Sequence, residues 1–501
     1  MINSKVAFSE NEKKLISEIK RLSEWLQADS ALRKRLCKGK GFTPEDRNWL
    51  CKIGVKLDTD EASFLWKYPD EVAAYLMIAA KEQETDMPDR LKEIVNKYPL
   101  LELWAKHSNS RNFITKAVEQ WSYAPSENGK FGAWRKRRVA ASKSELGYLG
   151  MQIGHPAFAF ELSEGCSIGC WFCSFAAIKL SANLDYPKEK DEVLSIIRQC
   201  GKLFGNTMIS MSLPYYRTEP HDNPYYLDFI KDFEKEIGAV LCTSTAVCND
   251  INWIKELLSY YQNRKDGTVY YWPRLSILSL PVLKKIHTAF TPMEIKDIDL
   301  LIQVKDHERP KVTGGRILKE QAGLRGIEDF SVLDRSKLAA SIPQGTIACV
   351  SGFNINLVSR KIMIFSPCYT SEKWPHGFRV FGETSYTDES DFGEAITGLV
   401  DKYMISSPPM DEILRFRDDI IYHPTEEGFD LATPHQLHHF KGKSKYGPLG
   451  QLISEGTYTY SQIFGILLEK HKVNPIVLRM IVQQLFDDGY IDEIYEKNKN
   501  K

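Results

Sequence analysis

The sequence lacks an excess of charge of either sign, has few cysteines and contains no long hydrophobic run. Its 501 residues include 66 lysines and arginines against 66 aspartates and glutamates, so the formal net charge is zero. Proteins that bind nucleic acid or anionic membranes usually carry a net basic face, so we expect neither partner. No apolar run approaches the ~18 residues that cross a bilayer, and residues 1–14 lack the apolar stretch of a secretory signal. We therefore expect a cytoplasmic protein with reduced thiols.

The hydrophobic pattern of residues 1–150 is helical. Ser9 and Glu12 have the spacing of a capping box at a helix start, and an apolar stripe follows on one helical face. We interpret this stripe as the core of an all-α N-terminal domain.

A basic run, 135–138, follows Phe131 and Trp134 near the end of this segment. It is either a surface patch for an acidic partner or a solvated helix face whose aromatic residues turn inward. We favour the second interpretation.

Residues 151–385 alternate short strand-like runs with helical stretches. This alternation is typical of βα units around a parallel sheet, so the expected fold class is α/β. The first strand is not followed by a glycine-rich phosphate-binding turn, which leaves a dinucleotide-binding fold unsupported. The candidate strands are 157–162, 207–213, 239–243, 274–280 and 300–304.

Residues 386–501 are expected to form a third domain, helical again after about residue 408. Two apolar helical faces are separated by Asn474 and Pro475, which predict an N-cap and a first helical residue. A short strand at 490–494 would complete a winged-helix-like module. Its second helix carries one cation and ends in two aspartates, which is poor for contact with phosphate. We therefore favour peptide recognition over DNA binding for this module.

Three of the 10 cysteines, Cys166, Cys170 and Cys173, form a C-x₃-C-x₂-C motif directly after the first predicted strand. Three thiolates on one loop can bind three irons of a [4Fe–4S] cluster, and Gly165 and Gly169 allow the backbone to curl around it. The fourth iron is then open to a substrate. A structural zinc site would need a fourth ligand, and the chain holds no second C-x₂-C pair. Three ordinary buried cysteines are the other alternative.

This motif, with the aromatic Phe172 before its last cysteine, resembles that of the radical S-adenosylmethionine superfamily. The resemblance implies a partial (βα)₆ barrel in residues 151–385. It also implies a cluster whose open iron chelates S-adenosyl-L-methionine, and reductive cleavage of that cofactor to a 5′-deoxyadenosyl radical.

The same resemblance implies cofactor contacts outside the motif. Glu219 lies in a segment similar to the family's Gly-Gly-Glu-Pro segment, which binds the methionine amino group, although Arg217 and Thr218 replace the glycines here. Ser244 and Ser279 lie where the family places a ribose-facing strand end and a carboxylate-binding serine. The alternatives are a surface salt bridge for Glu219 and strand-end caps for the two serines.

A narrower resemblance is to the peptidyl amino-acid epimerases that mature proteusin-type ribosomal peptides. It covers roughly residues 150–385 and is carried by 162–173, 351–356 and 366–377. Those enzymes convert L-residues in the core of a precursor peptide into D-residues. The resemblance implies a precursor peptide, with leader and core, as one partner. It also implies an external electron donor such as a flavodoxin or ferredoxin.

Radical epimerisation needs a hydrogen-atom donor outside the cluster. The α-carbon radical left after abstraction is planar, and a thiol S–H is weak enough to return a hydrogen atom to its opposite face. Cys368, which follows a predicted strand, is the expected donor, and Cys349 is the alternative. Only these two cysteines follow Cys248, too few for a second cluster. The remaining five are expected to be core residues: Cys37, Cys51, Cys200, Cys242 and Cys248.

Two other functions stay open at this point. One is a radical enzyme that forms carbon–carbon or thioether bonds in a peptide. The other is a non-catalytic, metal-stabilised protein that binds a peptide or a nucleic acid.

Overall fold

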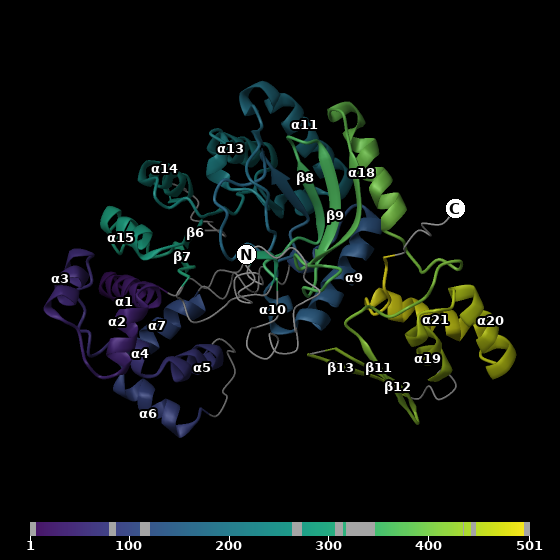
Figure 1. The fold of residues 1–501 in the computed structure, drawn as a ribbon, viewed down its shortest axis with the longest axis horizontal. Helices are drawn as coiled ribbons and strands as arrows, with labels where there is room; N and C mark the ends of the chain where they lie inside the picture. Colours follow the sequence, from purple (N-terminus) through teal and green to yellow (C-terminus); the bar gives the residue numbers. More distant parts are fainter. Residues whose placement is uncertain are drawn as a thin grey trace. The chain divides into compact units, whose positions relative to one another are not determined.

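The structure is a computed structural model, and Figure 1 shows its fold. It describes residues 7–79, 87–110, 121–262, 273–305, 314–316, 346–433, 435–441 and 447–494. The chain forms two compact units, each built from separate stretches of sequence. The first comprises Met1–Ala117, Glu219–His221 and Cys242–Pro310, and the second comprises the rest. Among the helices of the described residues, none is long and apolar enough to cross a bilayer.

The first unit packs helices against a parallel three-stranded sheet of order β5-β6-β7. Leu22 and Trp25 of α1 share one hydrophobic core with Leu275 and Ile277 of β6. The N-terminal helices therefore share their core with a sheet from the middle of the chain. The elements of this unit are α1 (Glu10–Ala28), α2 (Ser30–Cys37), α3 (Pro44–Lys52), α4 (Phe64–Lys67), α5 (Pro69–Ala79), α6 (Asp89–Lys97), α7 (Pro99–Ser110), β5 (Ser244–Thr245), α14 (Ile251–Gln262), β6 (Arg274–Ile277), α15 (Leu280–Ala289) and β7 (Asp299–Ile302).

Helix α1 begins at the predicted capping box. The Glu12 N–H donates to Ser9 Oγ at 3.2 Å, and the Ser9 N–H donates to Glu12 Oε2 at 2.7 Å. Its apolar stripe is buried, as expected. The buried guanidinium of Arg21 donates to the carbonyl oxygens of Ile53 and Phe290, both at 2.8 Å. These bonds tie α1 to the chain that follows α3 and to the end of α15.

The second unit is organised around a five-stranded mixed sheet of order β10-β9-β8-β1-β4. Strands β4, β1 and β8 run parallel, whereas β9 and β10 run antiparallel to their neighbours. Helices α9, α11 and α18 pack on one face of this sheet (Figure 1). On that face Phe131 of α9 and Phe204 of α11 contact Phe158 of β1 and Phe353 of β8. The elements around this sheet are α9 (Gly129–Leu146), α10 (Tyr148–Met151), β1 (Phe158–Glu161), β2 (Ser163–Glu164), β3 (Ala182–Asn183), α11 (Tyr186–Phe204), α12 (Asn206–Ser210), β4 (Ser212–Leu213), α13 (Tyr226–Ile237), β8 (Gly352–Asn356), β9 (Lys361–Pro367), β10 (Phe378–Ser385) and α18 (Glu389–Tyr403). The 3₁₀ helix η1 (Pro220–Asp222) begins in the stretch Glu219–His221 of the first unit.

The expected alternation of strands and helices is present, and the fold class is mixed α/β. Strands β1 and β4 pair in parallel, as do β5, β6 and β7, and β4 and β5 belong to different sheets. The predicted strand at 207–213 is wrong in its first part, which forms helix α12. Met208 and Ile209 are apolar and buried. A short apolar run of this kind occurs in buried helices as well as in buried strands, so the sequence pattern alone does not distinguish the two. The strand predicted at 239–243 lies slightly later, as β5.

The C-terminal part of the second unit is an antiparallel three-stranded sheet followed by three helices. The prediction of helix after about residue 408 is wrong for residues 421–440, which form this sheet. Its strands are short and expose one face, so only β12 shows a clear apolar alternation, with Phe429 and Leu431 buried. The elements are β11 (Ile421–Thr425), β12 (Gly428–Ala432), β13 (Leu437–Phe440), α19 (Gly447–Glu455), α20 (Tyr460–His471) and α21 (Pro475–Asp487).

The end of this module agrees better with the prediction made from the sequence. Asn474 is the N-cap of α21 and accepts from the N–H groups of Ile476 and Val477, with Pro475 first in the helix, as predicted. The strand predicted at 490–494 is reduced to a single bridge between Ile491 and Phe416.

Three of the four cations of the basic run on α9, Arg135, Arg137 and Arg138, are buried, so neither interpretation is right for their charges; Lys136 is exposed. Arg137 and Arg138 both donate to Glu493, and Arg135 donates to the carbonyl oxygen of Ser122 at 2.8 Å. The aromatic residues before the run do turn inward, as expected. The prediction of a surface run was wrong because the partners of these arginines, a distant carboxylate and backbone carbonyls, cannot be recognised from the local sequence.

Candidate active site

The cysteine motif forms a loop that follows β1 in the second unit. Gly165 and Gly169 have φ angles of +84° and +64°, in the left-handed region that favours glycine. A Cβ atom on Gly165 would lie 2.5 Å from the carbonyl oxygen of Lys179, so the chain can return this closely only at a glycine. The Cys166 N–H donates to the Ile178 carbonyl at 2.9 Å. The loop is therefore closed on itself by its own backbone.

The side chains of Cys166, Cys170 and Cys173 are partly exposed, and none forms a disulfide. Phe172 packs edge-to-face on Trp171, with ring centroids 5.7 Å apart. In the part of the chain that the structure describes, no three His, Cys, Asp or Glu side chains gather as ligands of one metal ion. The thiolates of an iron–sulfur cluster bind different irons and surround a group rather than a point. Three partly exposed cysteines on one curled loop have the chemistry of such a donor set.

A short segment, residues 314–316, is docked on the cysteine loop. The Arg316 N–H donates to the Cys173 carbonyl at 3.0 Å, and its guanidinium donates to the carbonyls of Cys170 at 3.5 Å and Ala177 at 2.5 Å. A Cβ atom on Gly315 would lie 2.2 Å from the carbonyl oxygen of Ser174. Sequence reasoning missed this contact, because its partners lie 146 residues apart and only the adjacent glycines hinted at a close approach.

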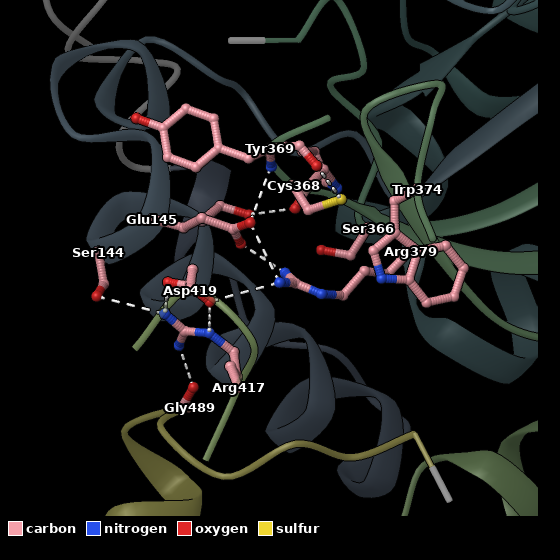
Figure 2. Close-up of polar contacts among 12 residues, drawn as sticks. Ser144, Glu145, Ser366, Cys368, Tyr369, Trp374, Arg379, Arg417, Asp419 and Gly489 are labelled. Carbon is pink, nitrogen blue, oxygen red and sulfur yellow. Dashed lines mark hydrogen bonds and ion pairs between the residues drawn. The ribbon is translucent and has the colours of Figure 1, made fainter. Parts of the chain in front are cut away.

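Cys368 follows β9, at the start of the connection to β10 (Figure 2). Its N–H donates to the Gly377 carbonyl at 3.0 Å, and its thiol donates to the Tyr369 carbonyl at 3.1 Å. The side chain is 0% exposed, and burial raises the pKa of the thiol well above its usual range. The group is therefore S–H at neutral pH. Because β9 is antiparallel to β8, Cys368 lies beyond the amino-terminal ends of β8 and β1.

Two contacts connect the cysteine loop with the chain that leads into β10. His376 Nδ1 lies 3.1 Å from the carbonyl oxygen of Ser174, and the Phe175 ring packs on Phe378 with centroids 6.0 Å apart. Gly377, between these two contacts, is the backbone partner of Cys368. These contacts link the end of the cysteine loop, at Ser174 and Phe175, to the connection that carries Cys368, although β1 enters the loop at the opposite, carboxyl end of the sheet.

A row of buried charges of alternating sign, Glu145, Arg379, Asp419 and Arg417, lies beside Cys368 (Figure 2). Arg379 of β10 donates to both carboxylate oxygens of Glu145 on α9, one of them at 3.1 Å, and lies 3.4 Å from Asp419. Arg417 donates to Asp419 at 2.8 Å. Burial raises the pKa of Glu145, although Arg379 opposes this change. Burial alone would lower the pKa of Arg379, but Glu145 and Cys368 together raise it.

This network also fixes the backbone next to the buried thiol. The Tyr369 N–H donates to Glu145 Oε1 at 2.8 Å. The carbonyl of the same residue accepts from Cys368. Sequence reasoning missed Glu145 and Arg379, because they lie on different elements and neither belongs to a local motif.

Cys349, the alternative donor, is partly exposed and lies just before β8. It is close to Tyr216, whose pKa is raised well above its usual range by burial and then by the charge of Cys349. The Tyr216 ring packs on Phe175 of the cysteine loop at 4.5 Å and on Phe365 of β9 at 4.8 Å. Both candidate donors are thus linked to the cysteine loop through aromatic or histidine contacts.

The residues expected to contact the cofactor outside the motif belong to the first unit. Glu219 is buried, and its carboxylate accepts from Thr245 Oγ1 and from the Ala246 N–H at 2.9 Å. The alternative of a surface salt bridge is therefore wrong for Glu219, which holds the carboxyl end of β5. Ser244 lies in β5, and Ser279 occupies the N-cap position of α15 without a side-chain capping bond. Both serines are partly exposed.

The five remaining cysteines differ in burial. Cys200 and Cys248 are buried, as expected of core residues, and Cys242 is partly exposed. The prediction is wrong for Cys37 and Cys51, which are exposed. Each follows a buried leucine in an amphipathic helix, so the next position turns toward solvent.

No family model matches this chain, and no solved structure matches it. The chain is similar to the uncharacterized protein y4wI of Sinorhizobium fredii strain NBRC 101917 / NGR234. The two are 28% identical over 489 residues, which cover 96% of this chain and 88% of that protein. This similarity extends through nearly the whole chain, but the name of the relative states no activity.

Proposed function

We propose that this chain is a radical S-adenosylmethionine enzyme that converts L-residues of a ribosomally made precursor peptide into D-residues. The observation that carries the proposal is the loop of Cys166, Cys170 and Cys173. It follows the first parallel strand of a β–α series, is shaped by two left-handed glycines and carries three partly exposed cysteines. The partial (βα)₆ barrel that the resemblance implies for residues 151–385 is part of this proposal, and the parallel pairs β1–β4, β5–β6 and β6–β7 support it.

The cysteine loop would hold a [4Fe–4S] cluster with one iron open to S-adenosyl-L-methionine. When bound, this pair supplies a 5′-deoxyadenosyl radical that takes the α-hydrogen from a peptide residue. Glu219, Ser244 and Ser279 are the residues proposed for binding the cofactor in the first unit. An external one-electron donor, such as a flavodoxin or ferredoxin, would reduce the cluster, and this chemistry suits the cytoplasm.

Cys368 would return a hydrogen atom to the opposite face of the α-carbon. Its burial supports this role, since a thiol kept as S–H has a hydrogen atom to give and a thiolate has none. The S–H bond breaks and a new Cα–H bond forms. The sulfur radical that remains needs one electron and one proton from an external donor before the next turnover.

The full burial of this thiol adds a requirement. Because Cys368 is 0% exposed, contact with a peptide requires the connection between β9 and β10 to move aside. Cys349 is partly exposed and needs no such movement, so it is the alternative donor. Variants of the two cysteines separate these roles.

The C-terminal module would hold the leader of the precursor peptide. Strand β13 pairs only with β12 among the described strands, so its other edge offers backbone groups to an added strand. Leu437 of β13 is 53% exposed, and Ile476 and Met480 of α21 are 69% and 66% exposed. These apolar side chains suit a peptide partner better than a phosphate backbone.

The test is co-expression, in deuterated water, with a candidate precursor peptide chosen from any small open reading frames beside the gene. An epimerised residue should gain one deuterium at its α-carbon, because the donor thiol exchanges its hydrogen with solvent. Mass spectrometry of a D-residue that carries deuterium would support the proposal. A modified peptide with a new carbon–carbon or thioether bond and no D-residue would contradict it.

A further inference from the structure

The centre of the five-stranded sheet contains an unpaired carboxamide. Asn354 lies in β8, in register with Ala159 of β1 and Met363 of β9, and is 2% exposed. Neither Oδ1 nor Nδ2 of this side chain has a hydrogen-bond partner in the described structure. Burying a carboxamide without partners costs free energy, and each such group in a native structure calls for a specific explanation.

The side chain of Asn354 faces away from the helices that cover the sheet. Its neighbour Phe353 contacts Phe131 and Phe204 on the helix-covered face, and successive side chains of a strand point to opposite faces. Phe365 of β9, two positions from the register partner of Asn354, shares its face and packs on Tyr216. The unpaired amide therefore belongs to the same aromatic-lined face as the contacts of the cysteine loop.

Asn356 is a second asparagine on this face, and its side chain has a full set of hydrogen bonds. Two residues along β8, on the same face, its Nδ2 donates to Glu161 Oε2 at 3.1 Å and to the Ser163 carbonyl at 3.2 Å. Its Oδ1 accepts from the N–H groups of Val358 and Ser359. Asn356 is fully used by the fold, whereas Asn354 is not.

We propose that Asn354 is a ligand-binding residue whose carboxamide pairs with a planar group that presents a hydrogen-bond donor beside an acceptor. Two sources offer this chemistry, and both rest on the proposed function. One is the amino edge of the adenine of S-adenosyl-L-methionine, which an asparagine amide pairs with twice. The other is the N–H and C=O of a single residue in an extended peptide, which point the same way, as in a β-ladder.

The experiment compares Asn354→Leu with the matched variant Asn356→Leu. Thermal melting of the ligand-free chain comes first and does not depend on the proposed function. Leucine is close to asparagine in size and removes an unpaired polar group at 354, so the melting temperature should stay equal or rise. At 356 the same change breaks four hydrogen bonds, so the melting temperature should fall. A fall at 354 as large as that at 356 would show a structural role and overturn the inference.

Calorimetric titration then identifies the source. The probes are S-adenosyl-L-methionine and a blocked pentaalanine peptide, each added to the cluster-loaded chain without reductant. Loss of two hydrogen bonds should weaken the affinity for one probe about tenfold or more in Asn354→Leu. Weakening for the first probe assigns the adenine, and weakening for the second assigns the peptide. Unchanged affinity for both probes, or no binding of either by the unmodified chain, overturns the inference. Failure of the proposed function is distinguishable, since it appears as absence of 5′-deoxyadenosine on reduction.

Discussion

The imidazole Nδ1 of His376 lies 3.1 Å from the carbonyl oxygen of Ser174. This contact joins the loop of the proposed cluster to the connection that carries Cys368. The carbonyl can only accept, so the His376 ring donates from Nδ1. The same connection reaches Glu145 through the Tyr369 N–H. A substitution in the cysteine loop should therefore disturb the connection that carries Cys368, and a substitution in that connection should disturb the loop.

Replacement of Cys368 by alanine should abolish the D-residue but leave 5′-deoxyadenosine formation intact. The peptide residue can still lose its α-hydrogen, but the variant has no thiol at 368 to return one. Chiral amino-acid analysis of the peptide and chromatography of the nucleoside check the two steps. Cys349→Ala is the matched control and should retain the D-residue. The reverse result, epimerisation lost only in the Cys349 variant, would assign the donor role to Cys349.

The pH dependence of epimerisation should reflect the buried thiol. Burial raises the pKa of Cys368 well above the ordinary thiol value of about 8.5, so the group stays S–H as the pH rises through that value. Yield of the D-residue per 5′-deoxyadenosine should therefore stay level between about pH 7.5 and pH 9.5. A decline centred near about pH 8.5 would indicate an exposed donor instead.

The raised pKa of Cys368 also makes the stability of the fold depend on pH. The unfolded thiol loses its proton at a lower pH than the folded one, so the contribution of Cys368 to stability is full below about pH 8.5 and falls as the pH rises further. Denaturant unfolding at several pH values should show a shallower decline for Cys368→Ala than for the unmodified chain. Equal slopes would show that the thiol titrates alike in both states.

Gly315→Ala should weaken the cysteine loop. The residue has a φ of +49°, and a Cβ atom would lie 2.2 Å from the Ser174 carbonyl oxygen, so the strain should cost about 1 kcal/mol or more. Iron and sulfide content per chain after reconstitution should fall severalfold. Gly398→Ala, in the middle of α18 with open space around it, is the control and should retain full iron content. Equal iron in both variants would show that residues 314–316 do not support the loop.

Glu493→Ala should destabilise the second unit strongly. Glu493 is the carboxylate partner of Arg137 and Arg138, and burial already lowers the pKa of Arg138 to about 10. Leaving two buried guanidinium groups without this partner should cost about 3–5 kcal/mol in free energy of unfolding. Lys136→Ala, on the exposed side of the same helix, should change it by less than about 0.5 kcal/mol. Similar small effects of both changes would mean that the buried pairs contribute little.

Local signals predicted much of the fold. The capping box at Ser9, the N-cap at Asn474 and the order of strands and helices in the middle of the chain depend on residues close in sequence, and the structure contains them. The prediction of a strand at 207–213 was wrong in its first part because a short buried helix and a buried strand contain the same kinds of apolar residue. The sheet at 421–440 was not predicted because its exposed strands contain too few apolar residues to show the alternating pattern of a strand.

The candidate site was predictable only where a local motif exists. The spacing of the three cysteines, with Gly165 just before the first and Gly169 before the second, indicated the loop from sequence alone. The docking of Arg316, the pairing of Glu145 with Arg379 and the unpaired amide of Asn354 arise from contacts between distant segments. For Asn354 one weak signal was present, since two asparagines, Asn354 and Asn356, stood in a short central strand that is buried throughout.

The central claim is that Cys166, Cys170 and Cys173 hold a [4Fe–4S] cluster that acts on S-adenosyl-L-methionine. The most direct measurement is 5′-deoxyadenosine released after anaerobic reconstitution with iron and sulfide, addition of S-adenosyl-L-methionine and reduction with dithionite. The account predicts a brown protein that releases the nucleoside, and loss of the nucleoside when any one of the three cysteines becomes alanine. A protein that binds zinc in place of iron and sulfide, or releases no 5′-deoxyadenosine on reduction, would contradict it.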